Sequence, residues 1–187
     1  MLDPGHGVRT PAGEPLNVGA VGPHGVQEQQ VALSVGTDLA GLLREAGARV
    51  VMTRSFAQPY RIANDRRSDN RARAALANRL GATAFLALHC DSSLDRRNAG
   101  ISVFWLRSNS EALARAIRAR LRPLGLGEAA FHRRELAVTE EARVPAVLVE
   151  LGFVSQPQQE ALLASPAFQH REAHALFDAI LDVFGRS

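Results

Sequence analysis

Four polar residues could carry chemistry together: His6, His89 and Glu150, which stand beside apolar or small residues, and Glu28, which is expected on the apolar side of a helix. His89 and Glu150 each end a short apolar run, at residues 84–88 and 146–149. A charged group in such surroundings is heavily penalised unless it is paired or binds a metal. Two imidazoles and one carboxylate are a common zinc ligand set, which leaves one coordination position open for water. These residues therefore predict a metal-dependent hydrolase.

The least certain of the four from spacing alone is Glu28. It is expected in the first turn of a helix over residues 26–46, where positions 28, 32, 35, 39, 42 and 46 form one buried face. A glutamate in a first turn is also explained by its favourable interaction with the helix dipole. The two histidines at nearby strand ends favour a role as a metal ligand.

Other polar residues compete for the same role. His24 precedes Glu28 by four residues but lies in Pro23-His24-Gly25, a poor helix segment, so it is expected in a loop. Asp91 is a reserve ligand, or a partner that orients a ligand. Asp3 is expected to orient the following loop or His6 through a hydrogen bond.

The remaining histidines and acidic residues are expected to have no part in the site. We expect packing or surface positions for three histidines and solvated positions for two glutamates that precede the last strand: His132, His170, His174, Glu140 and Glu141.

The elements that must position these residues alternate between strand and helix. Strands are expected at residues 1–3, 48–53, 84–89, 100–106, 134–138 and 146–150. Helices are expected at residues 26–46, 61–80, 110–121, 157–164 and 166–184. This order predicts a single α/β domain over residues 1–187, with a mostly parallel, mixed and twisted sheet of about six strands and helices on both faces. In such sheets ligands bind beyond the carboxyl ends of the strands, where His6, His89 and Glu150 all stand.

Composition excludes several other classes of protein. The chain has 187 residues, of which 46% are hydrophobic and 22% charged, enough for a normal core. All 22 basic residues are arginines and the net charge is only +3, so the high pI of about 10.3 does not predict a nucleic-acid groove. One cysteine allows neither an intrachain disulfide nor a Cys-x-x-Cys zinc site.

The sequence shows no membrane span and no signal peptide. No apolar run approaches the roughly 18 residues that a membrane span needs. The chain opens inside what is expected to be a strand, so that this first strand is expected to be truncated at its N-terminal end.

The motifs occur in the order typical of one family. The chain resembles the zinc-dependent N-acetylmuramoyl-L-alanine amidases of the amidase-3 type in Leu2-Asp3-Pro4-Gly5-His6-Gly7, in Glu28 with Val31 and Leu33, in Thr53-Arg54, in Arg73 with Ala77-Asn78, in Leu88-His89 and in Pro145-Ala146-Val147-Leu148-Val149-Glu150-Leu151-Gly152-Phe153. The resemblance implies one Zn²⁺ on the residues His6, Glu28 and His89, and a catalytic carboxylate at Glu150. It further implies a mixed sheet flanked by helices, peptidoglycan as the partner and substrate, cleavage between the lactyl group of N-acetylmuramic acid and L-alanine, and a cell-envelope location, periplasmic or secreted.

Two departures from the family pattern lie beside the ligands. Val8 replaces a second glycine, and Cys90-Asp91 replaces the usual alanine followed by Asn or Asp. Only residues 90–99 separate His89 from the next strand, so we expect no inhibitory helical insertion over the site. Two rival functions stay open: another zinc amidohydrolase or carboxypeptidase on the same scaffold, and a non-catalytic peptidoglycan-binding module. No glycine-rich phosphate loop follows a strand, which argues against nucleotide binding.

Overall fold

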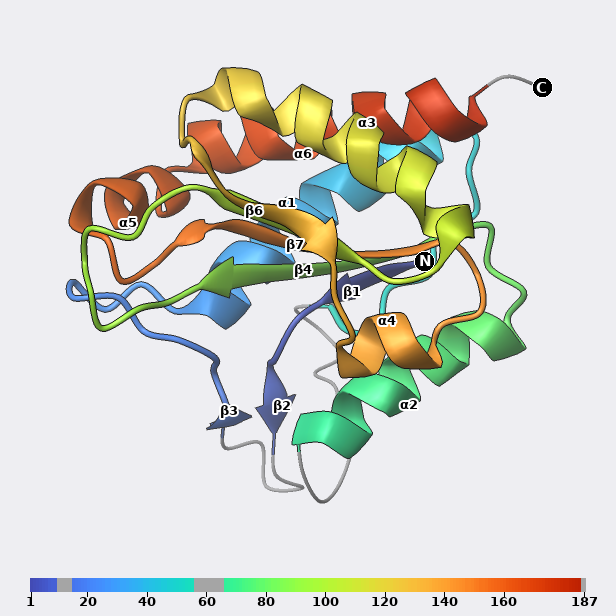
Figure 1. The fold of residues 1–187 in the computed structure, drawn as a ribbon, viewed down its shortest axis with the longest axis horizontal. Coiled ribbons are helices and arrows are strands. Elements are labelled where there is room, and N and C mark those ends of the chain that lie inside the picture. Colours follow the sequence, from blue (N-terminus) through green and yellow to red (C-terminus); the bar gives the residue numbers. More distant parts are fainter. Residues whose placement is uncertain (10–14, 56–65, 186–187) are drawn as a thin grey trace.

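A mixed sheet forms the centre of the molecule (Figure 1), in a computed structural model that describes residues 1–9, 15–55 and 66–185. Its strand order is β1-β4-β7-β5-β6. The strands span Leu2–Pro4 (β1), Phe85–Asp91 (β4), Ile101–Trp105 (β5), Glu128–Arg133 (β6) and Ala146–Phe153 (β7). All neighbours are parallel except β5 and β7, which run antiparallel. The predicted α/β class with a mixed sheet is confirmed.

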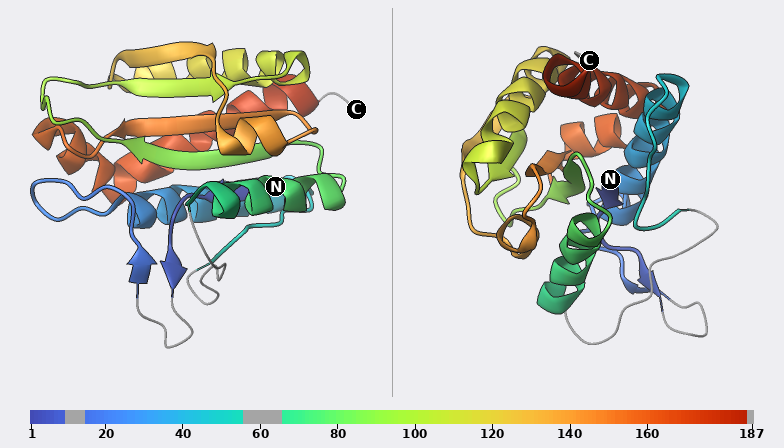
Figure 2. Two further views of the ribbon diagram at one scale, coloured as in Figure 1. Left: turned by 60° about the horizontal axis from the view of Figure 1, so that its bottom comes forward. Right: turned by 90° about the vertical axis from the view of Figure 1, so that its right-hand side faces the viewer.

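Helices cover both faces of this sheet, as expected (Figure 2). One face packs against α1 (Glu28–Glu45), α3 (Glu111–Leu121) and α6 (Pro166–Phe184), while α5 (Pro157–Leu163) follows the end of β7. The other face is partly covered by α2 (Arg66–Arg79) and the short α4 (Ala137–Glu141). Two 3₁₀ turns, Ser108–Ser110 and Arg122–Leu124, flank α3. None of the helices described combines the length and the apolarity that crossing a membrane requires.

Alternation along β4 explains why its sequence is apolar without interruption. Leu86 and Leu88 belong to the core beneath α1, α3 and α6, whereas Phe85 and Ala87 belong to the core beneath α2 and α4. A strand that is buried on both faces needs apolar residues at every position. By this alternation His89 lies on the α2 and α4 side, where its neighbour in the register on β7 is Glu150.

Two expected strands are not strands of this sheet. Residues 48–53 contribute only an isolated bridge between Leu2 and Met52, so the sheet has five strands rather than about six. The strand expected at residues 134–138 is wrong: β6 ends at Arg133, and helix α4 follows from Ala137. Val138 and Ala142 both enter the core beside α2, four residues apart, which is the spacing of a helix face.

The small N-terminal hairpin was also not predicted. Strands β2 (Val8–Arg9) and β3 (Pro15–Asn17) pair antiparallel below the main sheet (Figure 2). The helix expected over residues 61–80 is present as α2 from Arg66, and residues 61–65 lie outside the described part of the chain. The other helices agree with prediction to within two residues at either end.

Candidate active site

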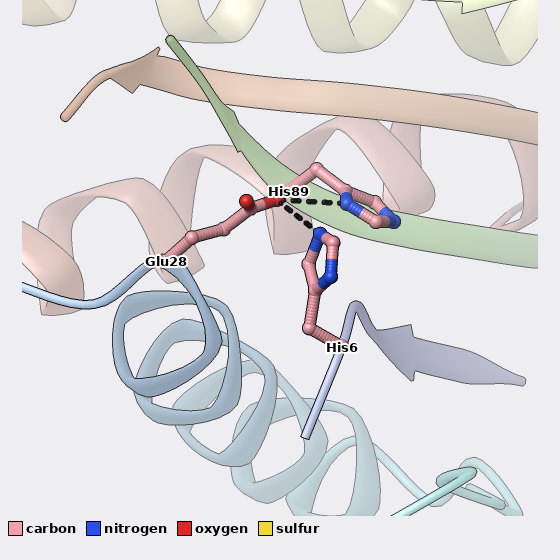
Figure 3. A group of neighbouring side chains, drawn as sticks. All are labelled: His6, Glu28 and His89. Atoms are coloured by element: carbon pink, nitrogen blue, oxygen red, sulfur yellow. Dashed lines mark hydrogen bonds and ion pairs between the residues drawn. The ribbon is translucent and has the colours of Figure 1, made fainter. Parts of the chain in front are cut away.

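Three side chains from three separate elements converge at the carboxyl edge of the sheet (Figure 3). His6 follows β1, Glu28 is the first residue of α1, and His89 lies near the end of β4. One oxygen of Glu28, Oε1, lies 2.9 Å from His6 Nε2 and 2.9 Å from His89 Nδ1. One possible ligand atom from each residue lies within 4.8 Å of the others. The sequence predicted these three residues, and the structure brings all three together.

The surroundings of the two histidines and of Glu28 suit a metal ion. His6 Nδ1 lies 2.9 Å from Asn17 Oδ1, and an amide oxygen can only accept a hydrogen bond. In the neutral imidazole the lone pair is therefore on Nε2, where a metal can bind; without a metal, a hydrogen bond from Nε2 to Glu28 needs a second ring proton. The three side chains are only 6–10% exposed, and a nitrogen, nitrogen and oxygen donor set fits zinc. Asn17 was not singled out from the sequence, because nothing marks it within the long 4–25 loop.

The carboxylate of Glu28 is held in its ionised form. Burial by itself raises its pKa, but hydrogen bonds from His6 and His89 outweigh burial and bring the pKa far below the usual range. The backbone N–H groups of Ala20 and Cys90 also donate to this carboxylate, at 2.8 and 3.1 Å. A carboxylate with this many donors is prepared to bind a cation.

Two buried arginines hold the loop that presents His6. Arg54 donates to the carbonyl oxygens of Pro4 and Gly5, at 2.8 and 2.7 Å. Arg73 donates to the carbonyl oxygen of His6 at 2.9 Å, and His6 itself has the left-handed backbone angle φ of 60°. That conformation is rare for a residue with a side chain, so these bonds help to maintain it.

Asp3 acts on this loop through Arg73. It accepts hydrogen bonds from Arg73 Nη1 at 2.8 Å and from Thr53 Oγ1 at 2.6 Å, and it is fully buried. Burial raises the pKa of Asp3, but the charge of Arg73 and the hydrogen bonds from Thr53 and Arg73 together lower it overall. The predicted orienting role thus runs through a buried ion pair with Arg73, a role that was not predicted for Arg73.

Close packing around the cluster requires glycine at two positions. A Cβ atom at Gly5 would lie 2.3 Å from His89 Cε1, and one at Gly19 would lie 2.4 Å from Glu28 Oε2. Gly19 also has a positive φ of 76°. The backbone therefore approaches two of the three clustered side chains as closely as it can.

Glu150 lies beside the cluster in a different environment. It lines the same cavity of about 520 Å³ as His6, Glu28 and His89. Its Oε2 is buried and has no hydrogen-bond partner among the described residues. Burial, followed by repulsion from Glu28 and Asp91, raises the pKa of Glu150 well above its ordinary value. This carboxyl group can therefore take up and release a proton next to the clustered side chains.

The competing histidine is bound elsewhere. His24 Nδ1 lies 2.8 Å from the buried Glu160 of α5, which also accepts from the backbone N–H of His24 and Val26. The predicted position of His24 in a loop is confirmed, and it is not part of the three-residue cluster. Glu160 instead ties down the segment that leads into α1 and Glu28.

The other polar candidates stay outside the cluster. Asp91 lines the cavity at the end of β4 without joining the three residues. His132 packs its ring against Phe104 at 5.1 Å, and the exposed His170 and His174 lie 3.0 Å apart. Glu140 accepts a hydrogen bond from Arg71. Residues 92–100 contain no helix, as the short spacing after His89 predicted.

Comparisons with known proteins agree on one family. The family model described as Amidase_3: N-acetylmuramoyl-L-alanine amidase matches residues 1–182. The probable cell wall amidase LytH of Staphylococcus epidermidis is 28% identical over 186 residues, which cover 98% of this chain but only 57% of that relative. The chain thus spans little more than half the length of this curated relative.

Two solved structures have the same fold over nearly their whole length. N-acetylmuramoyl-L-alanine amidase AmiC2 of Nostoc punctiforme superposes with a TM-score of 0.85 at 26% identity, covering 99% of this chain and 96% of its own. The catalytic domain of CwlV, an N-acetylmuramoyl-L-alanine amidase from Bacillus (Paenibacillus) polymyxa, superposes with a TM-score of 0.84 at 27% identity, covering 100% and 97%.

Proposed function

We propose, since this chain belongs to the Amidase_3 family of N-acetylmuramoyl-L-alanine amidases, that it hydrolyses the amide between the lactyl group of N-acetylmuramic acid and L-alanine in peptidoglycan. The observation that carries this proposal is the convergence of His6, Glu28 and His89 beside Glu150 in one cavity. Peptidoglycan as substrate places the working protein in the cell envelope, in the periplasm or outside the cell.

The proposed metal is one Zn²⁺ held by His6, Glu28 and His89. Its support is the donor set, the low exposure of the three side chains and the fixed tautomer of His6. When bound, zinc lowers the pKa of a coordinated water to about 7 and polarises a carbonyl oxygen. The chain's own contribution is to hold the three ligands in place through Asn17, Arg54 and Arg73.

Glu150 is the proposed proton carrier. Its carboxylate accepts a proton from the attacking water while the water oxygen bonds to the lactyl carbonyl carbon. It then donates that proton to the alanine nitrogen as the carbon–nitrogen bond breaks, so that one water is consumed and a carboxyl group and an amine result. A carboxyl group whose pKa is raised well above its ordinary value holds the proton between the two halves of this transfer.

Two variants separate metal binding from proton transfer. His89→Ala is expected to lose the metal found in purified wild-type protein, close to one zinc per chain. Glu150→Gln is expected to keep the metal and to abolish hydrolysis of purified peptidoglycan. Asp91→Asn serves as a control that keeps the metal. Full metal content in His89→Ala, or turnover by Glu150→Gln, would contradict these assignments.

The products decide between the proposed reaction and its relatives. Mass analysis of digested peptidoglycan should show free stem peptides that begin at L-alanine. Products cut elsewhere in the stem would indicate a different zinc amidohydrolase or a carboxypeptidase. Zinc binding without any products would indicate a non-catalytic module.

A further inference from the structure

The catalytic cavity continues toward the edge of the sheet. A second hollow of about 350 Å³ shares Asp91, Phe104 and Arg134 with the cavity that holds the clustered histidines. The register places Ser102 of β5 between Glu150 of β7 and Ala130 of β6, so this second hollow lies over the strands next to Glu150. A substrate longer than its reacting bond can therefore extend from Glu150 toward β6.

Arg134 stands where the two hollows meet. It follows β6 directly, and its backbone N–H donates to the carbonyl oxygen of Trp105 at 2.7 Å. Its guanidinium group lies 5.0 Å from the centre of the Phe104 ring. This cation–π contact holds the side chain where the two hollows meet, and the two hollows together are called the groove below. Arg134 is exposed and is the one arginine that lines either hollow among the described residues.

The guanidinium group of Arg134 makes no ion pair with a carboxylate of the described residues, in contrast to those of several other surface arginines. Five other arginines each form an ion pair with a neighbouring carboxylate: Arg71, Arg97, Arg115, Arg118 and Arg120. Arg134 instead keeps its hydrogen-bond donors available. A guanidinium group has a fork of donors that matches a carboxylate in two parallel hydrogen bonds.

The proposed substrate carries its negative charge on one side of the reacting bond only. The lactyl carboxyl group is part of the amide bond and carries no charge, and the sugar ring is neutral. The stem peptide carries free carboxylates, of which the α-carboxylate of the second residue, a glutamate joined through its side chain, is nearest to the reacting bond. Charge complementarity therefore assigns the Arg134 side of the groove to the peptide.

We propose that Arg134 binds the α-carboxylate of the second stem residue and makes the enzyme prefer stems in which this group is free rather than amidated. This proposal rests on the proposed amidase function and adds the substrate class. Arg134 is thus a specificity-determining residue that contacts the leaving peptide.

The test compares two muramoyl dipeptides that differ in this one group. One carries L-alanyl-D-glutamate, with a free α-carboxylate, and the other carries L-alanyl-D-isoglutamine, with an α-amide; the γ-carboxylate is free in both. Arg134→Gln should raise KM for the acidic substrate about tenfold or more, the usual effect of losing a charge-assisted hydrogen bond, with kcat unchanged. KM for the amidated substrate should stay within about twofold.

Arg133→Gln is the matched control. Arg133 is the adjacent arginine, donates to the carbonyl oxygen of Leu106 at 2.8 Å and lines neither hollow. It should leave KM for both substrates unchanged. As a readout without turnover, the acidic substrate should bind Glu150→Gln protein more tightly than the Glu150→Gln/Arg134→Gln double variant, by the same factor.

The outcomes separate the two proposals. Equal losses on both substrates, a shifted pH profile of kcat without a change in KM, or no change at all would overturn the role of Arg134 while leaving the amidase function intact. Failure of zinc-loaded wild-type protein to cleave either dipeptide or whole peptidoglycan would overturn the amidase function, and the role of Arg134 with it.

Discussion

A buried glutamate far from any described charge partner gives the sharpest prediction about stability. Glu172 lies on the inner face of α6 with 0% exposure, next to Ala173 and four residues after Phe168. Both of its carboxyl oxygens are buried and have no hydrogen-bond partner among the described residues. Burial raises the pKa of Glu172 well above its ordinary value, because it disfavours the charged form.

The consequence is a stability that falls as pH rises. In the unfolded chain a glutamate ionises near pH 4.3, whereas folded Glu172 keeps its proton to higher pH. Between the pKa of the unfolded glutamate and the higher pKa of folded Glu172, the folded state binds more protons than the unfolded state. In this pH range the free energy of unfolding decreases by about 1.4 kcal/mol per pH unit. Over two such units the loss is about 2.7 kcal/mol, a large part of the 5–15 kcal/mol typical of a domain.

Glu172→Gln removes this titration while keeping the size of the side chain. We expect the variant to gain stability relative to the wild type as pH rises from 5 to 7, by up to about 2.7 kcal/mol. Urea unfolding at pH 5, 6 and 7 measures this gain, with a chelator present because zinc binding is itself pH-dependent. Glu45→Gln, at an exposed position on α1, is the control.

The refuting result is a pH-independent difference. If Glu172→Gln and wild type keep the same difference in unfolding free energy from pH 5 to 7, folded Glu172 is ionised and our account of its burial is wrong. Glu172→Leu extends the test, because it also removes the unpaired polar group. It should be more stable than Glu172→Gln at every pH.

Three further substitutions test the supports of the site. Gly5→Ala should lower zinc affinity at least about tenfold, since its Cβ would overlap the ring of His89; Gly41→Ala, in open space on α1, should instead add about 0.4–1 kcal/mol of stability and keep zinc. Arg73→Met should cost about 3–5 kcal/mol in urea unfolding, because it leaves a carboxylate buried without its partner. Glu160→Met should cost about 1–3 kcal/mol, because it removes the acceptor for the backbone N–H groups of His24 and Val26; unchanged stability in either of these last two would contradict the bonding described.

The sequence predicted where the site residues lie along the strands better than it predicted how they are held. His89 and Glu150 follow unbroken apolar runs, and such runs mark central strands whose ends share one edge. The hydrogen bonds of Arg54 and Arg73 to the His6 loop join residues about 50 to 70 positions apart. No local pattern encodes such contacts, because they depend on how the helices and strands pack.

The misplaced strand has a similar cause. β6 is an edge strand that is mostly exposed, so its sequence lacks the apolar run that marks β4 and β7. The apolar pair Leu136 and Val138 further along has the spacing of a strand, and this spacing favours a strand at residues 134–138 instead. In the structure Val138 faces α2 from a short helix, so tertiary packing decided the conformation there.

Two glutamates of the cavity show how one residue type can serve opposite purposes. Glu28 receives hydrogen bonds from two histidines and two backbone N–H groups, so it stays ionised even when buried. Glu150 has a buried oxygen without a described donor and faces the negative charges of Glu28 and Asp91, so its proton is held more tightly. Environments that push two pKa values apart assign their roles: the first suits a metal ligand and the second a proton carrier. Exchanging these roles would require moving the donors and not the carboxyl groups, which is why the loop around Gly19 and Ala20 is as much a part of the site as the glutamates themselves.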